Sequence, residues 1–99
     1  MSSIASIALS GMQAAQLTLD TSANNVANSS TPGYQHEQVA QTSQPGGGVA
    51  ATVLSTGVQG DTMAADLVTQ LQAKTDFLAN LSVFKASDKM AGKLIDTLA

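Results

Sequence analysis

The sequence predicts an all-α protein in which two long helices form a helical hairpin or coiled coil and are joined by a glycine-rich loop. Three observations support this class: apolar residues recur at alternating helical spacings near both ends, the middle is rich in Gln, Ser, Thr and Gly, and aromatic residues make up only 3% of the chain. We therefore expect a single module over residues 1–99, with helices over 3–28 and 61–98 and a loop over 31–60.

The first predicted helix carries a seam in which small side chains alternate with larger ones, so that a neighbouring helix can approach closely. Gly11 lies inside this helix, where glycine costs about 1 kcal/mol relative to alanine, and we interpret it as a close contact between helices. Ile4 and Ile7 lie partly off the seam, which is typical of a helix buried on several sides. The seam consists of Ala5, Ala8, Met12, Ala15, Leu19, Ser22 and Val26.

A cluster of asparagine, proline and glycine predicts where the first helix ends. Asparagine tolerates left-handed backbone and bonds its own backbone, and proline disfavours helical conformation in the residue before it. The helix-terminating motif consists of Asn24, Asn25, Asn28, Thr31, Pro32, Gly33 and Tyr34.

The predicted loop contains Pro45 followed by three glycines, without the spacing of a phosphate-binding loop. Residues 37–42 and 49–54 on either side are compatible with a short β-hairpin. Because two isolated strands are only marginally stable in water, we interpret the region as a loop with weak β character. His36 and Glu37 are interpreted as a solvated pair with no role in assembly.

The second predicted helix keeps its repeat for about five heptads, which favours coiled-coil packing over an ordinary amphipathic helix in a bundle. Asp61 or Thr62 can cap its first turn. Asp88 on the seam either fixes the register of the helices as a buried polar residue or lies exposed. The seam consists of Met63, Leu67, Gln70, Lys74, Phe77, Leu81, Phe84, Asp88, Ala91, Ile95 and Leu98.

Composition excludes several classes of function. The formal charge is −3, and the four lysines are interleaved with acidic residues, so we expect no nucleic-acid partner. No apolar run approaches the roughly 20 residues of a membrane-spanning helix, so we expect no membrane insertion. There is no cysteine, and no residues have catalytic or metal-ligand spacing. We therefore expect no enzyme activity, no metal and no cofactor.

Both ends of the chain resemble the bacterial flagellar axial proteins, which are the rod, hook and hook-associated subunits. The N-terminal signature of that family has the form S-G-L-x-A-A-Q-x-x-L-D-x-x-S-N-N-I-A-N-x-x-T-P-G-Y, and the segment from Ser10 to Tyr34 follows it closely. The last helix is similar to the C-terminal pattern of the family through Leu67-Val68, Ala79-Asn80 and Ser87-Asp88, with Phe77 in place of the usual Tyr.

The resemblance implies a structural subunit of the flagellar basal-body rod, or of a closely related axial structure, that self-assembles by coiled-coil packing of its terminal helices. It implies copies of the chain, homologous rod and hook subunits and the flagellar export apparatus as partners. It also implies export without a cleaved signal peptide into the periplasm-spanning rod of the basal body. Family members normally place β-rich domains between the two helices, whereas only residues 31–60 connect them here.

We expect the assembly interface at seven seam positions, because these carry the larger apolar side chains. They are Met12, Leu19, Val26, Phe77, Leu81, Phe84 and Ile95. The alternative function is a soluble helical adaptor or chaperone-like module that binds one partner helix. An assembly subunit forms open-ended arrays, whereas an adaptor saturates as a small closed oligomer.

Overall fold

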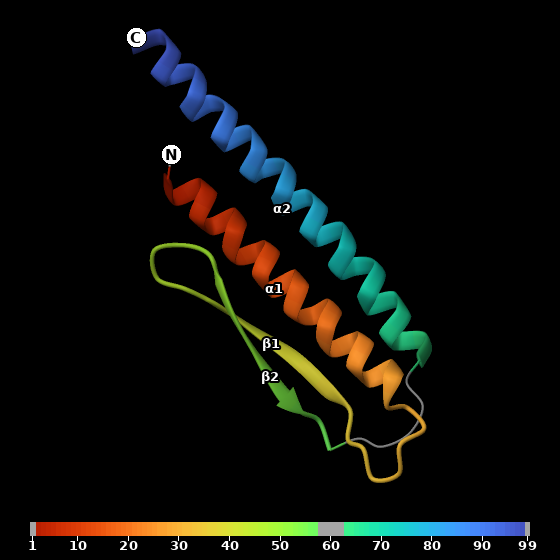
Figure 1. The fold of residues 1–99 in the computed structure, drawn as a ribbon. Helices are drawn as coiled ribbons and strands as arrows, with labels where there is room; N and C mark the ends of the chain where they lie inside the picture. The colour runs from red at the N-terminus through yellow and green to blue at the C-terminus, as the bar shows by residue number, and fades with distance from the viewer. Residues whose placement is uncertain (1, 58–62, 99) are drawn as a thin grey trace.

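The computed structural model describes residues 2–57 and 63–98. Its elements follow along the chain as α1 (Ser2–Ala27), β1 (Glu37–Ser43), β2 (Val49–Ser55) and α2 (Met63–Leu98). The two helices lie side by side and antiparallel, and the strands lie along α1 on the side away from α2 (Figure 1). The molecule is elongated, with extents of 62 × 25 × 14 Å. α1 is thus the central element, covered by α2 and by the strands.

The predicted all-α class is wrong, because the region between the helices forms an antiparallel two-stranded sheet. Its register pairs Glu37 with Ser55 and Ser43 with Val49. The prediction treated the strands as an isolated hairpin, but a hairpin that packs on a helix gains the stability that an isolated one lacks. α1 offers that support because its apolar surface is wider than α2 can cover.

The turn of the hairpin depends on the proline and glycines that follow Gln44. Gly47 N–H donates to Gln44 O over 3.0 Å, and Gly46 has a φ of 96°. Proline before a positive-φ glycine is the pattern of a type II turn. A Cβ on Gly48 would lie 2.7 Å from Ser10 Oγ, so glycine also lets the turn approach α1 closely.

Small and polar side chains fill the interface between α1 and α2. A Cβ on Gly11 would lie 2.5 Å from Asn80 Oδ1, which confirms the predicted close helix contact at this glycine. Ser22 Oγ donates to Asp66 O over 2.7 Å near the other end of the interface. The buried residues of α1 and α2 are Ala8, Met12, Ala14, Ala15, Thr21, Ser22, Asn25, Asp66, Ala73 and Ser87.

The face of α2 that meets α1 is rotated from the predicted seam. Asp66, Ala73 and Ser87 are buried, whereas the predicted seam residues Lys74 and Asp88 are exposed. The seam was traced through large apolar side chains, but small side chains allow the two helix axes to come closest. The small-residue stripe therefore faces α1. Asp88 is exposed and is not a buried polar residue that fixes the register of the helices.

The ends of the helices differ slightly from the predicted ranges. α1 ends at Ala27, one residue before the predicted end, and α2 is described from Met63. The predicted capping residues of α2, Asp61 and Thr62, lie outside the described residues.

Candidate functional site

The chain leaves α1 through two consecutive turns. Thr31 N–H donates to Asn28 O over 2.9 Å, and Tyr34 N–H donates to Thr31 O over 3.2 Å. Pro32 and Gly33 occupy the centre of the second turn, and Gly33 has a φ of 78°. These are the residue types that a type II turn requires, and the turn reverses the chain toward the start of β1.

The asparagines end the helix through their side chains. Among the described residues only glycines have positive φ, so the left-handed conformation expected for asparagine is not used. Asn28 Nδ2 donates to Asn24 O over 2.9 Å and to Asn24 Oδ1 over 3.0 Å. Thr31 Oγ1 donates to Asn28 Oδ1 over 3.3 Å. Asn24 O also accepts the helical bond from Asn28 N–H at 3.0 Å, so these side-chain bonds reinforce the last turn of α1 and tie Thr31 to it.

The buried amide of Asn25 joins α1 to β1. Its Nδ2 donates to Glu37 O over 2.8 Å, and its Oδ1 accepts from Glu37 N–H over 2.9 Å. The amide thus bonds both backbone groups of the first strand residue, as a neighbouring strand would. These two bonds fix the orientation of the amide, and only 3% of Asn25 is exposed.

Tyr34 ties the turn to the same pair of residues. Its hydroxyl donates to Asn25 Oδ1 over 2.9 Å, accepts from Asn24 Nδ2 over 3.1 Å and lies 3.3 Å from Glu37 Oε1. Burial raises the pKa of the Tyr34 hydroxyl above its usual value, and the neighbouring Glu37 carboxylate raises it further. The hydroxyl therefore keeps its proton, which the bond to Asn25 requires.

His36 links this region to α2, which corrects its interpretation as a solvated loop residue. Its Nε2 lies 3.0 Å from Asp66 Oδ1 and 3.0 Å from Asn25 Nδ2, and its side chain is 22% exposed. Nε2 donates to Asp66 when it carries a hydrogen and accepts from Asn25 when it does not. Glu37 is likewise bonded, through Asn24 Nδ2 at 3.0 Å, so neither residue of the pair is merely solvated.

We call these six residues the polar cluster: Asn24, Asn25, Tyr34, His36, Glu37 and Asp66. Asp66 is the member that the sequence did not single out, because it follows the motif by more than thirty positions. The available signal was an acidic residue early in the second helix, where an antiparallel hairpin brings it next to the end of the first.

The seven predicted interface positions are spread along both helices. Met12 is buried, and the half-buried positions are Leu19, Val26, Phe77, Leu81 and Phe84. Leu19 and Phe77 line one hollow together with Ala15 and Ala73 of the helix pair. Ile95, near the end of α2, is 65% exposed.

Residues 2–57 and 63–98 contain no group of three or more His, Cys, Asp or Glu side chains arranged to hold a metal ion. Within the same ranges, no helix is long and apolar enough to cross a membrane.

The geometry defines a structural module. The side chains of the polar cluster bond one another and the backbone, and together they fix where α1 ends, where β1 begins and how α2 approaches. Residues 6–35 match the family model described as "Flagella basal body rod protein". The match spans most of α1 and the turn through Tyr34, and it confirms the resemblance recognised in the sequence. The match covers 30 of the 99 residues and supports, in general terms, a structural role in the flagellar basal-body rod. No curated protein sequence matches the chain.

Proposed function

We propose that this chain is a rod subunit that self-assembles through its helices. The helices of one copy pack against the helices of other copies, or against those of homologous rod and hook subunits. The observation that carries the proposal is the unequal length of the two helices. α2 has 36 residues and α1 has 26, so at 1.5 Å per residue α2 is about 54 Å long and α1 about 39 Å. The C-terminal end of α2 extends past the start of α1 (Figure 1).

The uncovered end of α2 carries large apolar side chains. Leu94, Ile95 and Leu98 are 54%, 65% and 80% exposed, and Ile4 and Leu9 of α1 are also exposed at the same end of the molecule. Fully burying a side chain of this size stabilises by about 1.5–3 kcal/mol. A helix from a neighbouring subunit is the element that fits this surface, because Leu94 continues the stripe of Ala73 and Ser87 on which α1 packs, and Ile95 widens it.

The remaining parts of the proposal follow from the family. The subunit is exported by the flagellar export apparatus without a cleaved signal peptide, and it occupies the periplasm-spanning rod. Ordering two long helices costs conformational entropy, which burial against neighbouring subunits offsets during assembly.

Sedimentation of the full chain over a range of concentrations tests this proposal. The parent chain is expected to form open-ended, concentration-dependent species, whereas Ile95→Asp blocks them and keeps its helicity because the side chain is already exposed. Thr97→Asp places the same charge on the opposite side of the helix and is the matched control. Leu81→Asp lowers both helicity and association because Leu81 is half-buried between the helices.

A small closed oligomer that saturates with concentration would favour the adaptor alternative. Unchanged association in Ile95→Asp would remove the end of α2 from the interface.

A further inference from the structure

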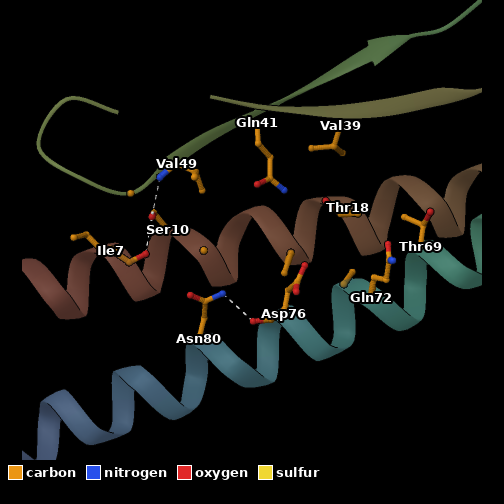
Figure 2. Close-up of a pocket in the computed structure, with 14 residues that line it drawn as sticks. Ile7, Ser10, Thr18, Val39, Gln41, Val49, Thr69, Gln72, Asp76 and Asn80 are labelled. Carbon is orange, nitrogen blue, oxygen red and sulfur yellow. Dashed lines mark hydrogen bonds between the residues drawn. The ribbon is translucent and has the colours of Figure 1, made fainter. Parts of the chain in front are cut away.

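Two neighbouring hollows lie on α1 and are lined by β1 and α2, and we call them together the groove. The larger hollow has a volume of about 500 Å³ and the smaller one about 250 Å³. Thr18, Val39 and Thr69 line both, so the two hollows adjoin. Figure 2 shows Val39 and Gln41 pointing from β1 toward α1, with side chains of α2 on the other side.

One wall of this groove is the outer edge of β1. Gly48 O accepts from Gln44 N–H, and His36 O accepts from Thr56 N–H, so the hydrogen-bonded pairs of the hairpin fall on even-numbered residues of β1. Because pairs alternate in an antiparallel ladder, the backbone groups of odd-numbered residues point away from β2. Glu37 obeys this rule, since both of its backbone groups bond Asn25.

The same edge continues beyond Glu37 without a partner. Within residues 2–57 and 63–98, no hydrogen bond from outside the hairpin reaches the backbone groups of Val39, Gln41 or Ser43. Neither proline nor a charged side chain, the usual protections of an exposed edge, occurs between Gln38 and Ser43. Asn25 therefore occupies only the first position of an edge that can accept a strand.

The chemistry of the groove suits an extended segment with a basic residue. Thr69, Gln72 and Asn80 of α2 give it a polar wall, whereas a third helix would need an apolar one and would leave the backbone groups of β1 without partners. Gly11 and Ala15 are small residues of the floor, which Asn80 and the neighbouring residues already cover, so side chains of a bound strand would contact the rim residues Ser10 and Thr18. The charged residues that line the groove, apart from His36, are the acidic residues Asp76, Glu37 and Asp66.

We propose that the groove between β1 and α2 binds an extended segment of a partner protein, which carries a Lys or Arg and pairs with the outer edge of β1. The pairing uses the backbone groups of Val39, Gln41 and Ser43, and the basic side chain lies beside Asp76. This surface is separate from the helical packing proposed above, because it lies over α1 and not at the end of α2.

A synthetic peptide with the sequence of residues 49–55, in which Lys takes the place of Thr52, is a suitable probe because that sequence already pairs with β1 in the hairpin. Titration of the full chain is expected to give saturable binding and at least about tenfold slower hydrogen exchange at the amides of Val39, Gln41 and Ser43. The amides of Gln38 and Ala40 serve as internal controls, because they already bond β2.

Two matched pairs of protein variants sharpen the test. Gln41→Pro removes one outward N–H and is expected to abolish binding, whereas Gln41→Ala keeps that N–H and binds. Asp76→Lys is expected to weaken binding by about fivefold or more, whereas Asp88→Lys, on an exposed part of the same helix, leaves it unchanged. Should Gln41→Pro fail to fold, a peptide with N-methyl groups along its pairing edge tests the same bonds.

Binding without protection of the three amides, or equal binding by the N-methylated peptide, would overturn the proposal. Equal losses in Asp76→Lys and Asp88→Lys would overturn the basic specificity. Ile95→Asp should bind the peptide normally, so failure of helical assembly and failure of the groove are distinguishable.

Discussion

Asn25→Ala should be the most damaging single change in the polar cluster. It removes the bonds to Glu37 N–H and O at 2.9 and 2.8 Å and the bond from the Tyr34 hydroxyl at 2.9 Å. A net contribution of about 0.5–1.5 kcal/mol per hydrogen bond gives a loss of roughly 1.5–4.5 kcal/mol. Alanine is the better helix former and returns about 0.5 kcal/mol, which leaves an expected loss of about 1–4 kcal/mol.

That loss is a large share of the stability of a domain of this size, which is typically about 5–15 kcal/mol. Urea denaturation followed by circular dichroism measures the change in free energy of unfolding. Hydrogen exchange at the Glu37 amide reports the local effect, because Asn25 Oδ1 is the acceptor for that N–H. We expect this amide to exchange faster in Asn25→Ala.

Asn24→Ala is the matched control. Asn24 is exposed, and its side chain bonds only other side chains: the Tyr34 hydroxyl at 3.1 Å, Glu37 Oε1 at 3.0 Å and Asn28 Nδ2 at 3.0 Å. Because these bonds are exposed to water and none involves the backbone of Glu37, we expect a smaller loss of stability than in Asn25→Ala and a Glu37 amide that stays protected. If both variants lost equal stability, or if the Glu37 amide exchanged at the parental rate in Asn25→Ala, the assigned link between α1 and β1 would be refuted.

Two further predictions concern the turn that follows α1. The pKa of the Tyr34 hydroxyl is raised in the folded chain relative to its value of about 10 in the unfolded chain. Tyr34 therefore contributes its full stabilisation at pH values below the unfolded-state pKa, and this contribution is lost as the pH rises through the folded-state pKa. Stability should therefore fall more steeply above about pH 10 in the parent than in Tyr34→Phe, and parallel curves in alkaline urea denaturation would contradict this. Replacing Pro32-Gly33 by Ala-Ala should lengthen α1 beyond Ala27 and detach the Tyr34 hydroxyl from Asn25. If the turn were kept, alanine at position 33, where φ is 78°, would cost about 1 kcal/mol. Amide hydrogen exchange and helicity measured by circular dichroism would report these changes. Unchanged protection of residues 28–34 would show that this turn does not limit the helix.

The local features of the chain were predictable because they depend on neighbouring residues. The end of α1 follows from the restriction that Pro32 imposes on the residue before it and from a turn that needs Gly33. The close contact at Gly11 was also predictable, since a glycine inside a long helix has few other uses. The same run of residues carried the family resemblance that the match over residues 6–35 confirms.

Features that depend on distant partners were not predictable. The hairpin was judged by its own stability, yet its stability comes from packing on α1. His36 was judged by its neighbour Glu37, yet its partner Asp66 is thirty residues away and becomes adjacent only when the helices pair. The amide of Asn25 was expected to act on its own backbone, but it bonds Glu37 across the turn.

The sequence by itself determined that there are two long helices, where the first one stops and which family its N-terminal region resembles, because periodicity and turn chemistry are local properties. Only the tertiary structure decided which stripe of α2 faces α1. Several apolar stripes satisfy the same periodicity, and the choice among them depends on how closely the two helix axes can approach. The stripe with Ala73 and Ser87 permits the closest approach, so it is buried, whereas Leu67, Leu71 and Leu78 on other sides of α2 stay exposed.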